Sequence, residues 1–326
     1  IAQWYPRMCA YYELEGWQNK SYVNQGEFAL EFGSFEVEIT VPADYIVAST
    51  GSLQNASEVL SSKMQDRLEK ARKSSQPVMI VSQEEAEAAL EQKARGKKTW
   101  KFKAEKVRDF AWTSSRKFIW DAMAVKQGGK DVMAMSYYGK EGNPLWEQYS
   151  TRVVAHTLKS YSSHTFDYPY PTAISVEGSN GMEYPMICFN YGRPDADGTY
   201  SDAIKYGMIS VIIHEVGHNY FPMIVNSDER QWTWMDEGLN TFMQFMAEQE
   251  WDRNYPSRRG PAHKIVPYMK SEKHLLEPIM TNSENIIQFG PNAYAKPATA
   301  LNILRETVMG RDLFDFAFQE YSKRWM

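Results

Sequence analysis

The sequence predicts a multidomain α+β protein, with an N-terminal antiparallel β-sandwich-like domain followed by a mostly α-helical domain. Apolar residues alternate with polar ones over residues 35–41, the period of a sheet with one solvated face. Residues 209–220 are apolar nearly all round, which is typical of a buried helix. The chain has 326 residues and 43% hydrophobic composition, enough for two domains with cores of their own.

We expect the first domain to cover residues 1–139. Its strand signals lie at residues 35–41, 45–50, 100–104, 109–112 and 132–138, and Gly128-Gly129 predicts a hairpin turn. Between them, residues 55–98 are dense in Glu, Lys, Arg, Ala and Gln, with helix starts near Ser57 and Ser82. This segment predicts a helical insertion whose mixed charges face solvent, and a surface for a partner is the alternative.

The second domain is expected to cover residues 140–326. Asn143 followed by Pro144 predicts a helix that runs to about His164. Residues 178–181 form a glycine-containing loop, which lets the backbone come close to another chain, as a strand that binds an extended peptide requires. The chain begins without Met and stops within a helical pattern, so we expect an excerpt whose second domain is truncated at its C-terminal end.

The sequence His-Glu-Val-Gly-His at residues 214–218 lies within the apolar helical run. Residues four apart share one helix face, so His214 and His218 can offer two imidazoles to one metal ion. Glu215 can then reach a metal-bound water. Such a pentapeptide also arises by chance on a solvated helix face, but the apolar surroundings argue against that interpretation.

A catalytic zinc site has three protein ligands and one open position. Eighteen residues separate His218 from Glu237, which lies in the stretch 232–240. This gap allows one helix to end at Pro222, a turn at residues 226–229, and a second helix that returns past the first. Glu237 is therefore the predicted third ligand.

These motifs resemble the gluzincin metallopeptidases, and in particular the aminopeptidase N family. Asn180-Gly181-Met182-Glu183-Tyr184 is similar to the family's Gly-Xaa-Met-Glu-Asn exopeptidase motif, with Asn and Tyr in place of its first Gly and its Asn. The segment that begins at Tyr294 is similar to the one that carries the family's catalytic tyrosine, with Pro297 in place of a common Gly.

The resemblance implies a thermolysin-like catalytic domain that binds one Zn²⁺ per chain. It implies that Glu215 is the general base, that Tyr294 stabilises the oxyanion, and that Glu183, Gly181 and Met182 bind the substrate's amino end. It also suggests that Gln3 approaches that amino end. Asp236 lies beside Glu237, and Thr241 lies one turn from it. Both side chains are candidates for orienting the metal ligands.

The predicted function is hydrolysis of N-terminal peptide bonds by a zinc aminopeptidase, with peptides that have a free N-terminus as its partners. A carboxylate at Glu183 favours an exopeptidase, because a free α-amino group is mostly charged at pH 7. A bifunctional zinc hydrolase that opens epoxides and a zinc-binding homologue without activity are the alternatives.

Composition excludes other classes. The net charge of -5 provides no basic surface for nucleic acid, and no run of eighteen apolar residues predicts a membrane span. Two cysteines are too few for a disulfide framework. The sequence does not predict a compartment, an oligomeric state or the preferred side chain of the substrate.

Overall fold

The computed structural model describes residues 1–326, which form two compact units. The first, here called the sheet unit, comprises residues Ile1–Pro6, Phe32–Lys159 and Asp167–Val216. The second, here called the helical unit, comprises residues Arg7–Glu31, Ser160–Phe166 and Gly217–Met326. The prediction of a mixed protein with strands in its N-terminal part and helices in its C-terminal part is confirmed at this level.

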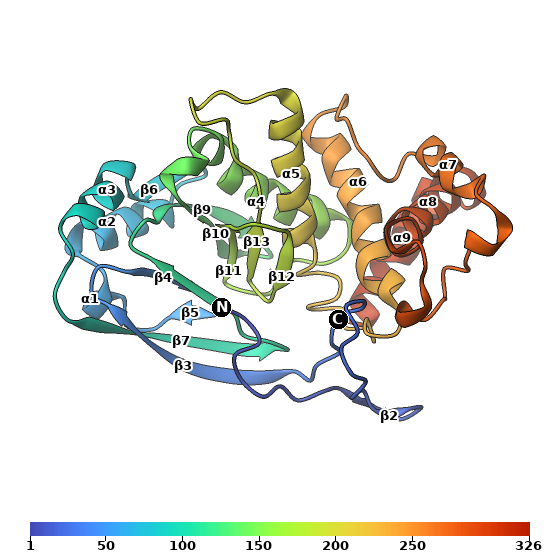
Figure 1. Cartoon of the computed structure of the whole chain (residues 1–326), viewed down its shortest axis with the longest axis horizontal. Helices are drawn as coiled ribbons and strands as arrows, with labels where there is room; N and C mark the ends of the chain where they lie inside the picture. The colour runs from blue at the N-terminus through green and yellow to red at the C-terminus, as the bar shows by residue number, and fades with distance from the viewer. The chain divides into compact units, whose positions relative to one another are not determined.

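The sheet unit contains three sheets (Figure 1). One has the order β3-β7-β5, a second pairs β4 with β8, and a six-stranded sheet has the order β12-β13-β11-β10-β9-β6. The β10–β11 and β11–β13 pairs are parallel, and the other pairs are antiparallel. The strands are β3 (Gly33–Pro42), β4 (Ile46–Ser49), β5 (Ser52–Leu53), β6 (Val78–Val81), β7 (Lys97–Val107), β8 (Trp112–Ser115), β9 (Ile119–Gln127), β10 (Lys130–Tyr138), β11 (Thr172–Glu177), β12 (Met182–Tyr184) and β13 (Ile187–Asn190).

Alternation explains the long β3–β7 pair. In β7 the side chains of Trp100, Phe102 and Ala104 are buried, whereas Lys101 and Lys103 between them are exposed. Successive side chains of a strand point to opposite faces, so this pattern buries one face of the sheet and leaves the other in water. The predicted strand at 35–41 is confirmed by β3.

The charged segment at residues 55–98 contains α1 (Ala56–Val59), α2 (Ser62–Ala71) and α3 (Gln83–Glu91). Ser82 caps α3 as predicted, since its hydroxyl accepts a hydrogen bond from the Glu85 N–H and the Glu85 carboxylate accepts one from the Ser82 N–H. The prediction of helices alone was wrong, because β6 lies within the segment and pairs with β9.

A two-residue turn joins β9 to β10. Gly128 and Gly129 have φ values of 50° and 79°, which only glycine adopts readily, so the predicted hairpin turn is confirmed. The strand β10 then pairs with β11, which follows the helix α4 (Leu145–His164). The six-stranded sheet therefore contains strands that precede Gly139 and strands that follow it. The domain boundary that the sequence predicts after Gly139 remains a prediction.

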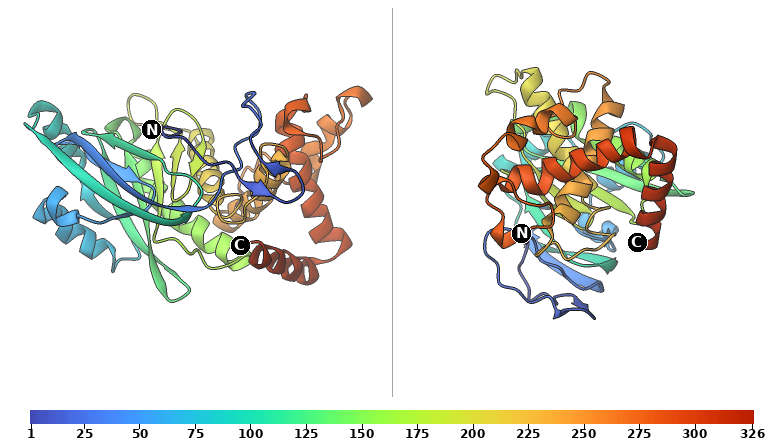
Figure 2. Two further views of the ribbon diagram at one scale, coloured as in Figure 1. Left: turned by 90° about the horizontal axis from the view of Figure 1, so that it is seen from below. Right: turned by 90° about the vertical axis from the view of Figure 1, so that its right-hand side faces the viewer.

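The helical unit is built around aromatic packing between α6 and α9. Phe242 lies 5.4 Å from Phe314 and 5.5 Å from Phe318 between ring centroids. The chain bends at Gly310, where φ is 81°, so that α9 turns away from the helix before it (Figure 2). The unit's strands and α-helices are β1 (Tyr11–Tyr12), β2 (Gly16–Trp17), α6 (Leu239–Trp251), α7 (Val266–Met269), α8 (Lys296–Ile303) and α9 (Arg311–Arg324).

Shorter helical turns complete the chain. The 3₁₀ turns are η1 (Lys140–Gly142), η3 (Ala262–Ile265), η4 (Lys273–Leu275) and η5 (Ser283–Asn285). Three turns are π-helical: η2 (Trp234–Gly238), η6 (Gly290–Ala295) and η7 (Leu304–Val308). None of the helices combines the length and apolar character that crossing a bilayer requires.

Candidate active site

The helix α5 (Asp202–Gly217) carries the His-Glu-Val-Gly-His motif at its C-terminal end. His214 and Glu215 lie in its last turn, and His218 follows directly after it, one turn beyond His214. Their apolar neighbours Ile213 and Val216 are completely buried, and all three polar side chains are buried too. The helix ends five residues before Pro222, where the sequence predicted its end.

In the helical unit, His218 and Glu237 form a pair of potential metal ligands. The Nδ1 of His218 lies 2.9 Å from the carbonyl oxygen of Phe221, to which a proton on Nδ1 can be donated. This hydrogen bond leaves the lone pair of Nε2 available for a metal. Nε2 lies 3.3 Å from Oε2 of Glu237, and two ligands of a tetrahedral zinc ion are about 3.4 Å apart. The donor pair therefore fits zinc in both chemistry and spacing.

Asp236 lies beside the same histidine, although neither of its carboxylate oxygens has a hydrogen-bond partner. Its Oδ1 lies 3.0 Å from Nδ1 of His218, and the carboxyl group is completely buried. Burial, followed by the nearby charge of Glu237, raises the pKa of Asp236 well above its ordinary value. The buried hydroxyl of Thr241 has no hydrogen-bond partner either, and no contact links it to the ligands.

Two π-helical turns carry Glu237 and Tyr294. Turns of this kind are rare in proteins, and those that do occur are often found at functional sites. The phenol of Tyr294 donates a hydrogen bond of 2.7 Å to Oε1 of Glu237. Burial, together with Glu237, raises the pKa of Tyr294 well above 10, so the phenol remains a donor at neutral pH.

Close packing sets Gly238, in the turn that carries Glu237, against Pro297 of α8, the helix that follows the turn carrying Tyr294. A Cβ on Gly238 would lie 2.4 Å from Cγ of Pro297, so only glycine permits this approach. Pro297 stands where a Gly is common in the aminopeptidase N family, and its ring fills the space beside Gly238. Sequence reasoning also missed Arg259, whose guanidinium carbon lies 4.1 Å from the ring centroid of Tyr294. No motif surrounds Arg259, so no signal in the sequence identifies it.

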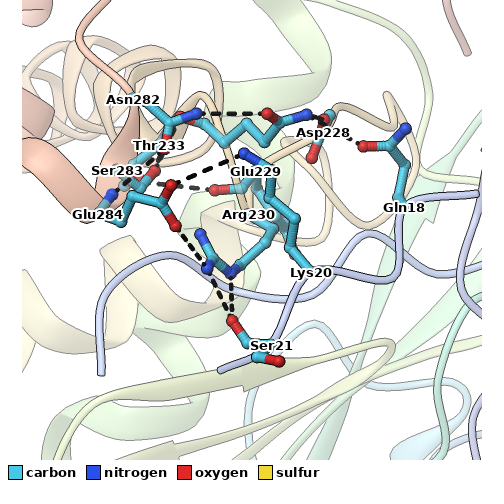
Figure 3. A network of polar contacts seen from close by, with 11 residues as sticks. Gln18, Lys20, Ser21, Asp228, Glu229, Arg230, Thr233, Asn282, Ser283 and Glu284 are labelled. Atoms are coloured by element: carbon cyan, nitrogen blue, oxygen red, sulfur yellow. Dashed lines mark hydrogen bonds and ion pairs between the residues drawn. The ribbon is translucent and has the colours of Figure 1, made fainter. Parts of the chain in front are cut away.

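A polar network supports the segment that leads to Glu237 (Figure 3). Arg230 is 2% exposed and donates hydrogen bonds from Nε and Nη2 to the carbonyl oxygen of Ser21, at 3.0 and 2.7 Å. Its Nη2 also lies 3.1 Å from Oε2 of Glu284. Thr233 is hydrogen-bonded to Ser283 in the same network. These bonds tie three distant stretches of the helical unit together just before η2.

In the sheet unit, Glu183 lies on the edge strand β12, opposite Cys188 of β13. Its carboxylate is 5% exposed, and Oε1 has no hydrogen-bond partner. The preceding loop touches the proposed base, because a Cβ on Gly181 would lie 2.3 Å from Oε1 of Glu215. Met182 is half-buried, and Gln3 is exposed.

The predicted residues thus form two groups. The helical unit brings together His218, Asp236, Glu237 and Tyr294. The sheet unit brings Gly181 to Glu215, and α5 carries His214 one turn before His218. No contact of Thr241 or Gln3 connects either residue to these groups.

Three comparisons with known proteins agree. A model of the Peptidase family M1 domain matches residues 149–326. Aminopeptidase 2 of Candida albicans is 24% identical over an alignment of 202 residues, and the match covers 57% of this chain and 22% of that protein. The M1 zinc metallopeptidase of Deinococcus radiodurans has a similar fold, with a TM-score of 0.60 at 17% identity over 90% of this chain and 57% of that one.

A mutant of the Deinococcus enzyme bound to a Tyr-Ser-Ala substrate is similar to the same extent, with a TM-score of 0.59 at 16% identity over 90% of this chain and 57% of that one. The chain thus spans less than two thirds of the length of these relatives. The family model nevertheless matches more than half of the chain. This chain therefore belongs to peptidase family M1.

Proposed function

We propose that the protein is a zinc-dependent aminopeptidase that removes the N-terminal residue of peptides. The observation that carries the proposal is the donor pair in the helical unit, His218 Nε2 and Glu237 Oε2, at the spacing of zinc ligands. His214, one turn before His218, is the proposed third ligand, which makes a site for one zinc ion per chain. Zinc, when bound, supplies Lewis-acid polarisation of the scissile carbonyl and a nucleophilic water near neutral pH.

Glu215 acts as the general base in this mechanism. It takes the proton of the attacking water and returns it to the leaving amine. Tyr294 keeps its proton, so its hydroxyl can donate a hydrogen bond to the oxyanion as the carbonyl is attacked. Donors in comparable positions contribute about 2.7 to 4 kcal/mol to transition-state stabilisation.

Glu183 selects the chain end. Its buried carboxylate has an unpartnered oxygen, which a charged α-amino group of the substrate satisfies. Gly181 and Met182, next to it, flank the substrate's first residue. An acylated substrate offers no charge to this carboxylate, so the buried group is left unpaired and the substrate is rejected.

The finer description of the fold belongs to the same proposal. We assign the strand-rich part to a β-sandwich-like domain of residues 1–139, with its insertion at 55–98. Residues 140–326 are assigned to a thermolysin-like catalytic domain, and peptides with free N-termini are the proposed substrates. No observation favours epoxide opening, and the complete set from His214 to Tyr294 argues against a homologue without activity.

Chelation tests the proposal. An aminoacyl fluorogenic amide should be hydrolysed, hydrolysis should stop when a chelator removes zinc, and added zinc should restore it. Glu215→Gln should retain zinc but lose at least about a hundredfold in kcat, because the general base is gone. Glu13→Gln, at an exposed position, is the matched control. Hydrolysis that survives chelation would refute a zinc mechanism.

A further inference from the structure

A cavity of about 150 Å³ lies inside the sheet unit, and none of the residues proposed for catalysis lines it. Side chains of the β3-β7-β5 sheet line one side of it, and side chains of the six-stranded sheet line the other. Trp100 and Phe102 stand two residues apart on β7, so they share a face. Met133, Met135 and Tyr137 do the same on β10, and all five residues line the cavity.

Two buried indole groups in the lining lack hydrogen-bond partners. Trp100 is 1% exposed and Trp120 is 3% exposed, and neither Nε1 atom has an acceptor. Buried indole N–H groups are normally satisfied, and an unsatisfied donor costs free energy. Both donors belong to residues that line the same cavity, so an acceptor atom held in that cavity is the candidate partner for them.

Stacking holds both indoles in place. Trp100 stacks on Phe102 with an interplanar angle of 5°, and Trp120 stacks on Tyr137 with an angle of 18° and centroids 5.1 Å apart. Trp120 and Tyr137 are also register partners of β9 and β10. The donors are therefore fixed by the two sheets, which is the preorganisation that a ligand site needs.

The two charged side chains among the lining residues, Arg72 and Asp131, already have partners of opposite charge. Arg72 contacts Glu69 at 3.2 Å, and Asp131 contacts Lys126 at 2.6 Å, so neither side chain favours a charged ligand. The rest of the lining is largely apolar. An apolar cavity of about 150 Å³ in another protein holds benzene, which sets the size of the occupant.

We propose that this cavity binds a small neutral molecule with an apolar body the size of one ring and a hydrogen-bond-acceptor oxygen. The oxygen accepts from the indole N–H of Trp100 or Trp120, and the ring fills the space between the sheets. The site is separate from the peptidase chemistry, so the two proposals can fail independently.

Acetophenone and ethylbenzene are the probes, because they share a ring and a similar shape but only acetophenone has an acceptor oxygen. Calorimetric titration of the protein should show acetophenone binding about tenfold more tightly than ethylbenzene. Trp100→Phe and Trp120→Phe remove one donor each and should reduce this preference. Trp325→Phe, at an exposed position, should leave it unchanged.

The crystal structure of the protein soaked with acetophenone shows directly where the ligand binds. We expect the carbonyl oxygen of acetophenone to lie within hydrogen-bond distance of one indole nitrogen. Equal affinity for both probes, no binding of acetophenone, or water alone beside both indoles would overturn the proposal. If one Trp variant fails to fold, the other variant and the unmodified protein still give the ratio that decides.

Discussion

At the scale of single residues, the contact between Gly181 and Glu215 sets the position of the proposed base. The loop backbone passes so close to the carboxylate that a methyl group at residue 181 would overlap Oε1 of Glu215. The end of a glutamate side chain can move away at little cost in stability. The proposed chemistry cannot tolerate that movement, because a general base must stay within hydrogen-bond reach of its proton.

Gly181→Ala is therefore expected to lower kcat by about tenfold or more while the protein stays folded and binds zinc. Gly207→Ala is the matched control, since nothing lies within 4 Å of a Cβ at that helical position. Steady-state kinetics and zinc content measure both effects. Equal kcat values in the two variants would show that the Gly181 contact does not position the base.

We expect Asp236 to act through His218, because Oδ1 of Asp236 lies 3.0 Å from the Nδ1 atom of His218. Asp236→Asn should weaken zinc affinity about 10- to 100-fold, because such supporting groups orient and polarise a ligating imidazole. Competition with a chelating dye measures the affinity, and Asp312→Asn, at an exposed position of α9, is the control. Unchanged affinity in Asp236→Asn would remove the supporting role.

At the scale of elements, local signals predicted the helix starts and turns best. The Ser82 cap and the Gly128-Gly129 turn each depend on a few adjacent residues, and both were found. The strands β6 and β9 were missed for a physical reason. β6 has only four residues, and β9 is buried on both faces, so neither shows the alternation that identifies a half-exposed strand.

In the candidate site too, residues that a local pattern identifies could be predicted, and residues that only tertiary contacts identify could not. His214 and His218 can be found from spacing alone, since helix geometry brings residues four apart to one face, and Glu215 directly follows the first of them. Tyr294 could not be chosen among 20 tyrosines without the resemblance, because its contact with Glu237 joins residues far apart in sequence. Arg259 and the Arg230 network depend on tertiary contacts in the same way.

The capping box of α3 gives a prediction at this scale. Burial opposes ionisation of Glu85, but its bonds to Lys63, the Ser82 N–H and Arg67 lower its pKa to about 2. Ser82→Ala removes one of the two capping bonds and should lower the free energy of unfolding by about 1 kcal/mol. Urea unfolding measures this loss against exposed Ser57→Ala. Equal stability of the two variants would contradict the cap's contribution.

At the scale of the whole molecule, stability depends on a buried acid in the core of the sheet unit. Asp121 accepts a hydrogen bond of 2.9 Å from the Tyr138 phenol. Burial raises its pKa from 3.8 to about 7, against the effect of hydrogen bonds from Thr151 and Tyr138. The folded state therefore holds a proton between these two pH values that the unfolded chain has released.

The free energy of unfolding should consequently fall as pH rises from about 4 to about 7. The contribution of Asp121 to this fall is up to about 1.4 kcal/mol per pH unit. Asp121→Asn cannot ionise, so its stability relative to the unmodified protein should increase across that range and level off above it. Urea unfolding at pH 5, 6 and 8 measures the difference. A difference that stays constant with pH would show that Asp121 does not titrate as described.

The central claim, that the protein acts on chain ends, is tested most directly by paired substrates. The specificity constant kcat/KM should be measured for an aminoacyl amide and for its N-acetylated twin. We expect the free amine to be preferred by at least about a hundredfold, and Glu183→Gln to reduce that preference, because the buried carboxylate needs a charged partner. Equal cleavage of the two substrates would contradict the account and indicate an endopeptidase.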